Sequence, residues 1–219
     1  MVAIKAEQLA RWFIKKNYDA PRNSKEGNMK LQKLLYFSQL VHLAKYNEPL
    51  FEEDICAFEN GSVVEKVRHL YQYSHTSFVN SAIVNDIHLS SEQLETLQTV
   101  ESLFGDLSAW ELSQLNHLHQ SWKDSYKRSK SGGYSWKAQS VITLEQMRTN
   151  ELDNMKEIIQ AYETGSNLNE YRNSNGRKFY YDAQSIELNE ELLSMLESFD
   201  GRDSAYTIYK DETVGLIIY

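Results

Sequence analysis

The sequence predicts a mainly α protein, in which a compact helical domain carries a small C-terminal α+β extension with two or three short strands. Only 2 prolines and 9 glycines occur among 219 residues, so few positions interrupt helices. Four Ser or Thr residues show capping-box spacing to a Glu or Gln three positions later, and helical apolar spacing follows each pair. These pairs are Ser62–Glu65, Ser90–Gln93, Ser108–Glu111 and Thr143–Gln146. After about residue 164 the chain becomes rich in β-branched and aromatic residues, which favours strands.

The first two helices are expected over residues 4–16 and 29–46. Asn28 is the expected N-cap of the second helix. Residues 29–46, placed on a helical wheel, are apolar around most of the circumference, which is typical of a helix at the centre of a bundle. The apolar face of the first helix carries Leu9, Trp12 and Phe13.

Residues 49–71 are interpreted as helix–turn–helix scaffolding. Asn60 and Gly61 predict a turn, and Ser62 is expected to cap the helix that follows. The inward face of that helix is expected to carry Val63, Val64, Val67 and Leu70.

Two domains are expected, a helical domain over 1–164 and an acidic α+β extension over 165–219. In the extension, KFYYDAQ, SAYTIYKD and TVGLIIY favour strands around a short helix in NEELLSMLESF. The extension holds 10 acidic and 5 basic residues, so 5 − 10 = −5 of the net charge of −8 lies there. Because so short a segment buries little apolar surface by itself, we expect it to pack on the helical domain.

Composition restricts the partners and the compartment. A net charge of −8 disfavours nucleic-acid binding, which depends on basic surface, and favours a basic protein partner. Cys56 is the single cysteine, so no internal disulfide can form, and a reducing cytoplasmic location is expected. The first 16 residues lack the apolar run of a signal peptide or membrane span, so no membrane association is expected.

The lysines of the second helix allow two interpretations. Lys30 and Lys33 both fall among apolar residues on the helical wheel, and burying an unpaired charge is costly. Their aliphatic stems can cover the core while the ammonium groups reach water. Alternatively, Lys30, Gln32 and Lys33 line a polar groove in the middle of the fold.

No motif predicts catalysis, a metal site or a cofactor. His117 and His119 are two residues apart, so they do not share a helix face, and no CxxC, HExxH or acidic cluster lies nearby. Cys56, between Ile55 and Ala57, is interpreted as a small buried hydrophobe rather than a nucleophile. Phosphate-loop, GxSxG and dinucleotide motifs are lacking. The residues by themselves therefore show no active site, and no enzymatic activity is expected.

Three blocks resemble the Panacea domain, which is typified by the SocA-like antitoxins. Residues 29–37, MKLQKLLYF, are similar to the K-L-Q-K-L-L-Y-Y signature of the family, and the lysines in an apolar helix make this block the most specific. Residues 49–51 and 57–64 resemble the second block, A-W-x-x-G-P-V-V, and Leu112 through Trp122 the third, L-S-x-x-T-H with its following Trp. Order and spacing agree over about residues 5–150. The departures are Phe58 for Trp, Ser62 for Pro and Asn116 for Thr.

The resemblance implies an antitoxin of a bacterial or phage toxin–antitoxin system that neutralises a cognate protein toxin by direct binding. The toxin is expected to be encoded by the neighbouring gene. An adaptor that delivers the toxin to a protease, or a phage protein of this fold with another protein partner, are the alternatives. The resemblance implies no cofactor and no catalytic residue. It also implies a polar core made by Lys30, Gln32, Lys33, Tyr36, Glu59, Asn60, Gly61, His117 and Trp122.

Overall fold

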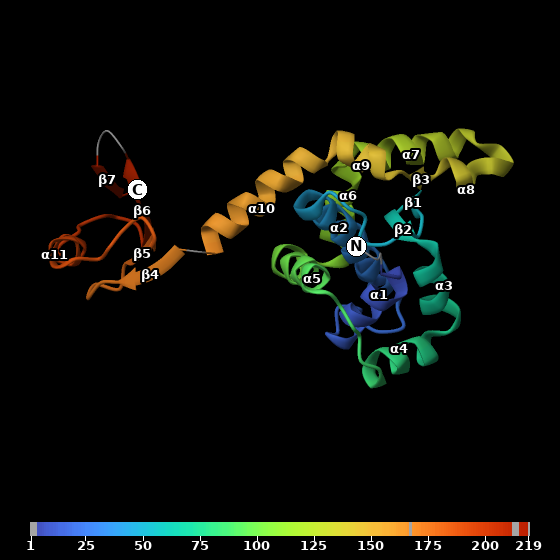
Figure 1. Ribbon diagram of the computed structural model, residues 1–219, viewed down its shortest axis with the longest axis horizontal. Coiled ribbons are helices and arrows are strands. Elements are labelled where there is room, and N and C mark those ends of the chain that lie inside the picture. The colour runs from blue at the N-terminus through green and yellow to red at the C-terminus, as the bar shows by residue number, and fades with distance from the viewer. Residues whose placement is uncertain (1–3, 167, 212–214, 219) are drawn as a thin grey trace. The chain divides into compact units, whose positions relative to one another are not determined.

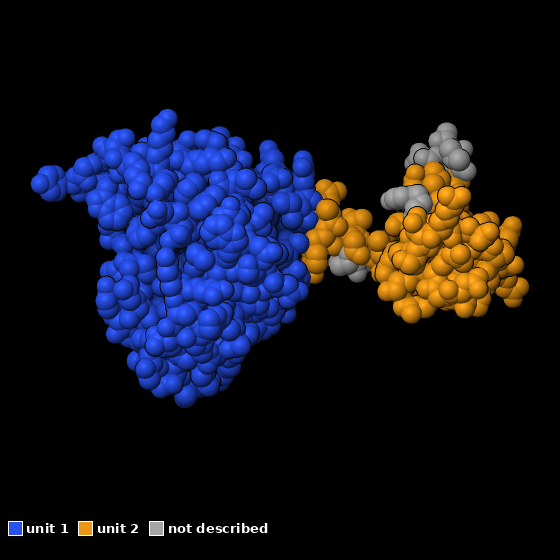
Figure 2. Space-filling view, turned by 180° about the vertical axis from the view of Figure 1, so that it is seen from behind, with its two compact units in different colours: residues 1–159 blue, residues 160–219 orange. Residues whose placement is uncertain are grey.

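The chain folds into two compact units, residues 1–159 and residues 160–219, which Figure 2 colours separately. The structure, a computed structural model, describes residues 4–166, 168–211 and 215–218. Each unit has its own cluster of buried hydrophobic side chains. The prediction that the C-terminal extension packs on the helical domain stays a prediction.

The mainly α prediction is confirmed, since the described residues are 59% helical with 11 helices. A short 3-10 turn, Gly133–Ser135, precedes α8. The elements of the first unit are α1 (Ala6–Lys15), α2 (Lys25–Tyr46), β1 (Ile55–Phe58), β2 (Gly61–Val64), α3 (Glu65–Tyr73), α4 (His75–Val84), α5 (Ser91–Phe104), α6 (Ala109–Leu118), α7 (Gln120–Ser131), α8 (Trp136–Gln139), β3 (Val141–Ile142), α9 (Leu144–Asn150) and α10 (Leu152–Ser166), the last of which continues into the second unit.

Three of the four predicted capping boxes are confirmed. Ser90, Ser108 and Thr143 each accept a hydrogen bond from the backbone of the third helical residue, at α5, α6 and α9. In each box the Gln or Glu side chain binds back to the N-cap backbone. The local sequence therefore determines where these helices begin, because the cap satisfies backbone groups that the helix itself cannot.

Helix α2 lies at the centre of the first unit, as its apolar circumference predicts (Figure 1). It packs against α1, α5, α6 and β2, and every residue from 31 to 43 is buried. It begins earlier than predicted, because Ser24 and not Asn28 is the N-cap and accepts a hydrogen bond from the amide of Gly27 at 2.9 Å. It ends at Asn47, which adopts the left-handed conformation typical of a C-cap.

Buried polar side chains in the C-terminal half of α2 have hydrogen-bond partners. The amide oxygen of Gln39 accepts hydrogen bonds from the backbone amides of Leu50 and Phe51 at 3.1 and 3.2 Å, and its nitrogen donates to the carbonyl of Phe51 at 3.1 Å. Nδ1 of His42 lies 2.7 Å from the hydroxyl of Thr96, and burial lowers the His42 pKa to about 4. The central helix thus anchors the loop that leads into β1.

The helix–turn–helix prediction for residues 49–71 is wrong. Strands β1 and β2 form an antiparallel hairpin, with Phe58 paired to Gly61 at the turn, and β3 adds to the other edge of β1. Ser62 lies within β2 and does not cap a helix, since α3 begins at Glu65. The valines at 63 and 64 favour a strand once β1 supplies a partner, and that pairing overrides the local capping-box spacing.

Beyond the end of α10, the described part of the second unit contains the helix α11 and a four-stranded mixed sheet of order β4-β5-β6-β7. Strands β5 and β6 are parallel, and α11 lies between them in the chain. The predicted helix and the three predicted strands are confirmed, except that Thr213, Val214 and Tyr219 lie outside the described residues. The elements are β4 (Leu168–Arg172), β5 (Lys178–Asp182), α11 (Glu190–Glu197), β6 (Ala205–Asp211) and β7 (Gly215–Ile218).

The predicted number of two or three strands in the extension is too low. Residues 168–172, which lie outside the three predicted strand segments, form β4, which pairs with β5 in antiparallel register from Leu168↔Asp182 to Arg172↔Lys178. Only Tyr171 of this strand packs against the core of the unit. A strand with so few apolar residues has no alternating hydrophobic pattern to reveal it.

Within the described parts of the chain, no helix is long and apolar enough to cross a membrane.

Candidate functional site around the β1–β2 hairpin

Strand β2 is an edge strand, and side chains take the place of a neighbouring strand along its free edge. The amide of Ser62 donates to Oδ1 of Asn116 at 2.6 Å, and the carbonyl of Ser62 accepts from Nζ of Lys33 at 3.0 Å. The amide of Val64 donates to Oε1 of Gln32 at 2.8 Å. Buried backbone groups need such partners, so α2 and α6 complete the hydrogen bonding that a further strand would otherwise supply.

Helices α6 and α7 bind the hairpin near its turn. The indole nitrogen of Trp122 donates to the carbonyl of Phe58 at 3.0 Å, and the hydroxyl of Ser113 donates to the carbonyl of Asn60 at 3.0 Å. Helices α2, α6 and α7 therefore hold one short hairpin through its backbone.

Gly61 allows the close approach of these helices. Its φ angle is +95°, a backbone conformation that residues other than glycine rarely adopt. A Cβ atom there would lie 2.5 Å from Oδ1 of Asn116 and 2.6 Å from Cε of Lys33. The glycine is required both by the backbone conformation and by the lack of space.

Lys33 does not reach water, which decides between the two interpretations of this residue. Its side chain is only 1% exposed, and no ion pair described in the structure includes it. Burial lowers the pKa of Lys33 to about 7. An ammonium group held in the core without a countercharge is rare and is associated with function more often than with stability.

Lys30 lies apart from the hairpin, although it belongs to the same predicted set. Its ammonium donates to the carbonyl of Gly105, which follows the last residue of α5, at 2.7 Å. A cation is favourable at a helix C-terminus. Burial lowers the pKa of Lys30, and the charges of Asp106 and Glu111 oppose this shift.

The remaining predicted aromatic and histidine residues form two further contacts. The rings of His117 and Trp122 pack with centroids 4.1 Å apart, and burial together with the charge of Lys33 lowers the pKa of His117. The hydroxyl of Tyr36 lies 2.7 Å from Nδ1 of His119. Burial raises the pKa of Tyr36 well above its usual value, so this hydroxyl stays protonated.

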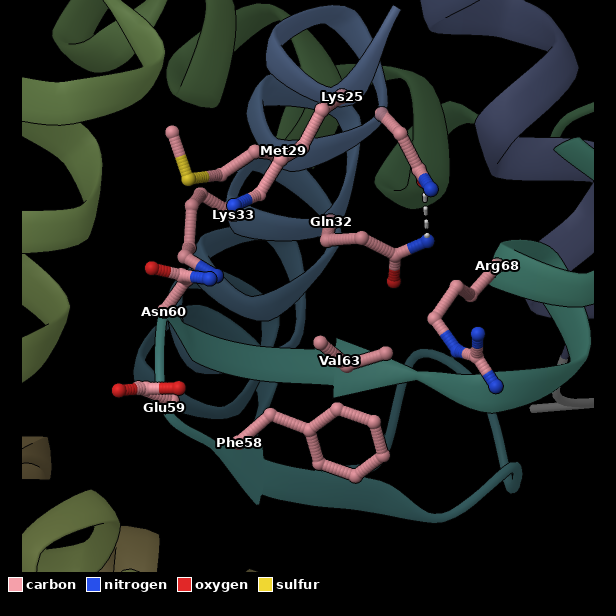
Figure 3. Close-up of a pocket in the computed structure, with 10 residues that line it drawn as sticks. Lys25, Met29, Gln32, Lys33, Phe58, Glu59, Asn60, Val63 and Arg68 are labelled. Carbon is pink, nitrogen blue, oxygen red and sulfur yellow. Dashed lines mark hydrogen bonds between the residues drawn. The ribbon is translucent and has the colours of Figure 1, made fainter. Parts of the chain in front are cut away.

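A pocket of about 280 Å³ opens beside the hairpin (Figure 3). Helix α2 supplies lysines to it, α3 supplies Arg68, and the hairpin supplies Phe58 and Val63. Of the nine predicted site residues, Gln32, Lys33, Glu59 and Asn60 line this pocket. Gly61, His117 and Trp122 lie behind it as hairpin supports, whereas Lys30 and Tyr36 bind elsewhere along α2. The complete lining is Lys25, Asn28, Met29, Gln32, Lys33, Phe58, Glu59, Asn60, Val63 and Arg68.

Two further observations concern metal ligands and the single thiol. No group of three or more potential metal-ligating side chains occurs among residues 4–166, 168–211 and 215–218. Cys56 is buried in β1, and burial raises its thiol pKa, which disfavours a nucleophilic thiolate.

Sequence reasoning missed Asn116, Ser113 and Arg68 as members of the site. In the sequence, Asn116 stands out only because it replaces the Thr of the third family block. Its role, to accept a hydrogen bond from the amide of Ser62, depends on where β2 lies. Arg68 lies outside all three blocks and reaches the pocket because α3 follows β2 directly. A β-hairpin prediction for residues 55–64 would have pointed to both neighbours.

We expect the Asn116→Ala substitution to lower the free energy of unfolding by about 2 kcal/mol, because the buried amide of Ser62 loses its only described acceptor. Ser113→Ala is the matched control, since the carbonyl of exposed Asn60 can bind water instead, and we expect a loss of at most about 1 kcal/mol. Urea denaturation followed by tryptophan fluorescence measures both, because all 4 tryptophans lie in the first unit. Equal losses would contradict the assigned role of Asn116.

Residues 31–123 match the family model described as antitoxin SocA-like, Panacea domain. This range includes Gln32, Lys33, the whole hairpin and its supports on α6 and α7, and it ends within α7. Comparison with curated proteins and with solved structures finds no match. The matched segment thus includes the hairpin and side chains of the three helices that hold it, and residues 31–123 of this chain are similar to the SocA-like Panacea domain.

Proposed function

We propose that this protein is an antitoxin that neutralises a cognate protein toxin by direct binding. The observation that carries the proposal is the Panacea domain over residues 31–123, whose family implies a toxin as partner. The buried polar site lacks the arrangement of nucleophile, base and oxyanion donors that catalysis would need.

Large exposed apolar side chains on the first unit support a protein as the partner. Trp110 and Leu118 on α6 are 65% and 68% exposed, and Tyr134, near α8, is fully exposed. Tryptophan and tyrosine are enriched among residues that dominate binding energy at protein interfaces.

We further propose a division of labour between the core and the surface. Lys30, Gln32, Lys33, Glu59 and His117 organise the shared core, and surface loops together with the C-terminal extension select the toxin. The hairpin contacts support this, because Gln32 and Lys33 bind the backbone of β2 and so do not depend on the identity of a partner.

Co-expression with the product of the neighbouring gene tests the function. We expect the toxin alone to arrest growth, and we expect this protein to restore growth and to co-purify with the toxin as a stable complex. A Trp110→Ser, Leu118→Ser variant should lose rescue while its unfolding transition is unchanged. Failure of both rescue and co-purification would contradict the proposal.

Toxin half-life separates direct neutralisation from delivery to a protease. We expect the half-life to be unchanged or longer in the presence of this protein, since bound toxin is protected. A shortened half-life that depends on a cellular protease would favour the adaptor alternative.

A further inference from the structure

The pocket beside the hairpin is basic in a protein that is acidic overall. Three of its lining residues, Lys25, Lys33 and Arg68, are cations, and Glu59 is the single acidic one. The whole chain has a net charge of −8, so the excess of positive charge in the pocket is opposite in sign to the net charge of the protein. Glu59 is exposed, and no described ion pair joins it to Lys33. Arg68 pairs with Glu65 of α3 at 3.3 Å, whereas no described ion pair includes Lys25 or Lys33. Two of the three cations therefore lack a described countercharge.

Two residues of the pocket, Lys33 and Arg68, and one residue that binds the hairpin beside it, Asn116, have hydrogen-bond donors without a described partner. Nζ of Lys33 can donate three hydrogen bonds, and one is described, to Ser62. Nε of Arg68 and Nδ2 of Asn116 are buried and have no partner. Leaving a buried donor unpaired costs about 1–3 kcal/mol, so such a cluster calls for a ligand that accepts hydrogen bonds.

The space and its walls restrict that ligand. Pockets for drug-sized ligands have volumes of about 300–1,000 Å³, and this one, at about 280 Å³, suits a single side chain. Met29, Phe58 and Val63 provide apolar walls that can contact methylene groups. The overall negative charge disfavours a polyphosphate or nucleic acid, whose further charges would be repelled.

We propose that this pocket binds a carboxylate side chain, an Asp or Glu of the protein partner, with its methylenes against Phe58 and Val63. The proposal rests on the proposed function, because it names the group by which the toxin engages the Panacea domain. Lys33 lies at the base of the pocket as the buried countercharge, and Arg68 and Lys25 form its rim. A carboxylate has the acceptor oxygens that the unpaired donors need, and charge-assisted hydrogen bonds are the stronger kind.

Butyrate and butyramide, which have the same shape and differ in charge, test the pocket without the toxin. In a nuclear magnetic resonance titration of the full chain at constant ionic strength, we expect butyrate to shift the amides of Gln32, Phe58 and Val63 in a saturable way. Lys33→Met and Arg68→Gln should each weaken this binding at least about tenfold, the loss expected when one partner of a buried charge pair is removed. Lys156→Gln on α10, an exposed lysine far from the lining residues in sequence, should change it less than about twofold.

Equal binding of butyrate and butyramide, or wild-type affinity in both pocket variants, would overturn the proposal. With the toxin, Arg68→Glu and Lys25→Glu should weaken complex formation at least about tenfold, whereas Lys156→Glu should not. Full neutralisation by both charge reversals would overturn the proposal and leave the antitoxin function standing. If the wild-type protein itself failed to bind the toxin, the proposed function would fall, and the butyrate titration would still decide whether the pocket takes a carboxylate.

Discussion

Replacing Lys33 with methionine is expected to raise the free energy of unfolding at pH 7 by about 3 kcal/mol. The shift of its pKa from 10.5 to about 7 means that the folded state disfavours the charged form. At pH 7 the lowered pKa of Lys33 costs the folded state about 4 kcal/mol, which the substitution removes. The substitution also removes the hydrogen bond to Ser62, which lowers stability by about 1 kcal/mol. Methionine keeps the length of the stem, so no large cavity is left.

The pH dependence identifies the charge as the cause. Between pH 7 and pH 10 the unfolded chain holds a proton on Lys33 that the folded chain releases, so the stability of the wild type rises with pH. The advantage of Lys33→Met should therefore shrink by about 1.4 kcal/mol per pH unit over that range and be constant below it. Urea denaturation at several pH values measures this, with Lys156→Met as the exposed control. A difference that does not vary with pH would refute the assignment.

Gly61→Ala is expected to destabilise the first unit by about 3 kcal/mol. The added methyl group would lie within 2.8 Å of Nζ of Lys33 and closer still to Asn116, and φ is +95°. Overpacking costs about 1–3 kcal/mol and a strained φ about 1 kcal/mol or more. Gly133→Ala separates the two effects, because Gly133 also has a positive φ but nothing within 4 Å of its Cβ position.

The comparison of the two glycine variants is the decisive measurement. We expect Gly133→Ala to cost about 1 kcal/mol, from backbone strain alone. Tryptophan fluorescence in urea reports on both sites, since both lie in the first unit. Equal losses would show that the neighbours of Gly61 relax at little cost and that the hairpin is not tightly clamped.

The two predictions concern the same contact, between the base of the pocket and the turn of the hairpin. Lys33 is tolerated there because it binds the backbone of Ser62, and Gly61 is required because the lysine stem passes so close. A site that carries a buried cation at a cost in stability is consistent with selection for binding, since stability alone would favour an apolar residue.

The amino-acid sequence by itself determined the helical body of this protein. Capping boxes at Ser90, Ser108 and Thr143 specify helix starts through contacts within four residues, and the apolar circumference of residues 29–46 specifies a central helix. Both patterns depend only on residues close together in the chain, so they predict these helices without knowledge of the fold.

Only the tertiary structure decided the hairpin and the use of each polar atom around it. Ser62–Glu65 shows the same capping-box spacing as the three confirmed pairs, yet Ser62 lies in β2 because β1 pairs with it, and only Glu65 belongs to a helix. The sequence pattern led to the same prediction for Lys30 and Lys33. In the structure, Lys30 binds the backbone at the end of α5, and Lys33 binds the backbone at the free edge of β2. The contacts of the two lysines span 29 and 75 residues, and no local pattern records which distant backbone group a side chain will reach.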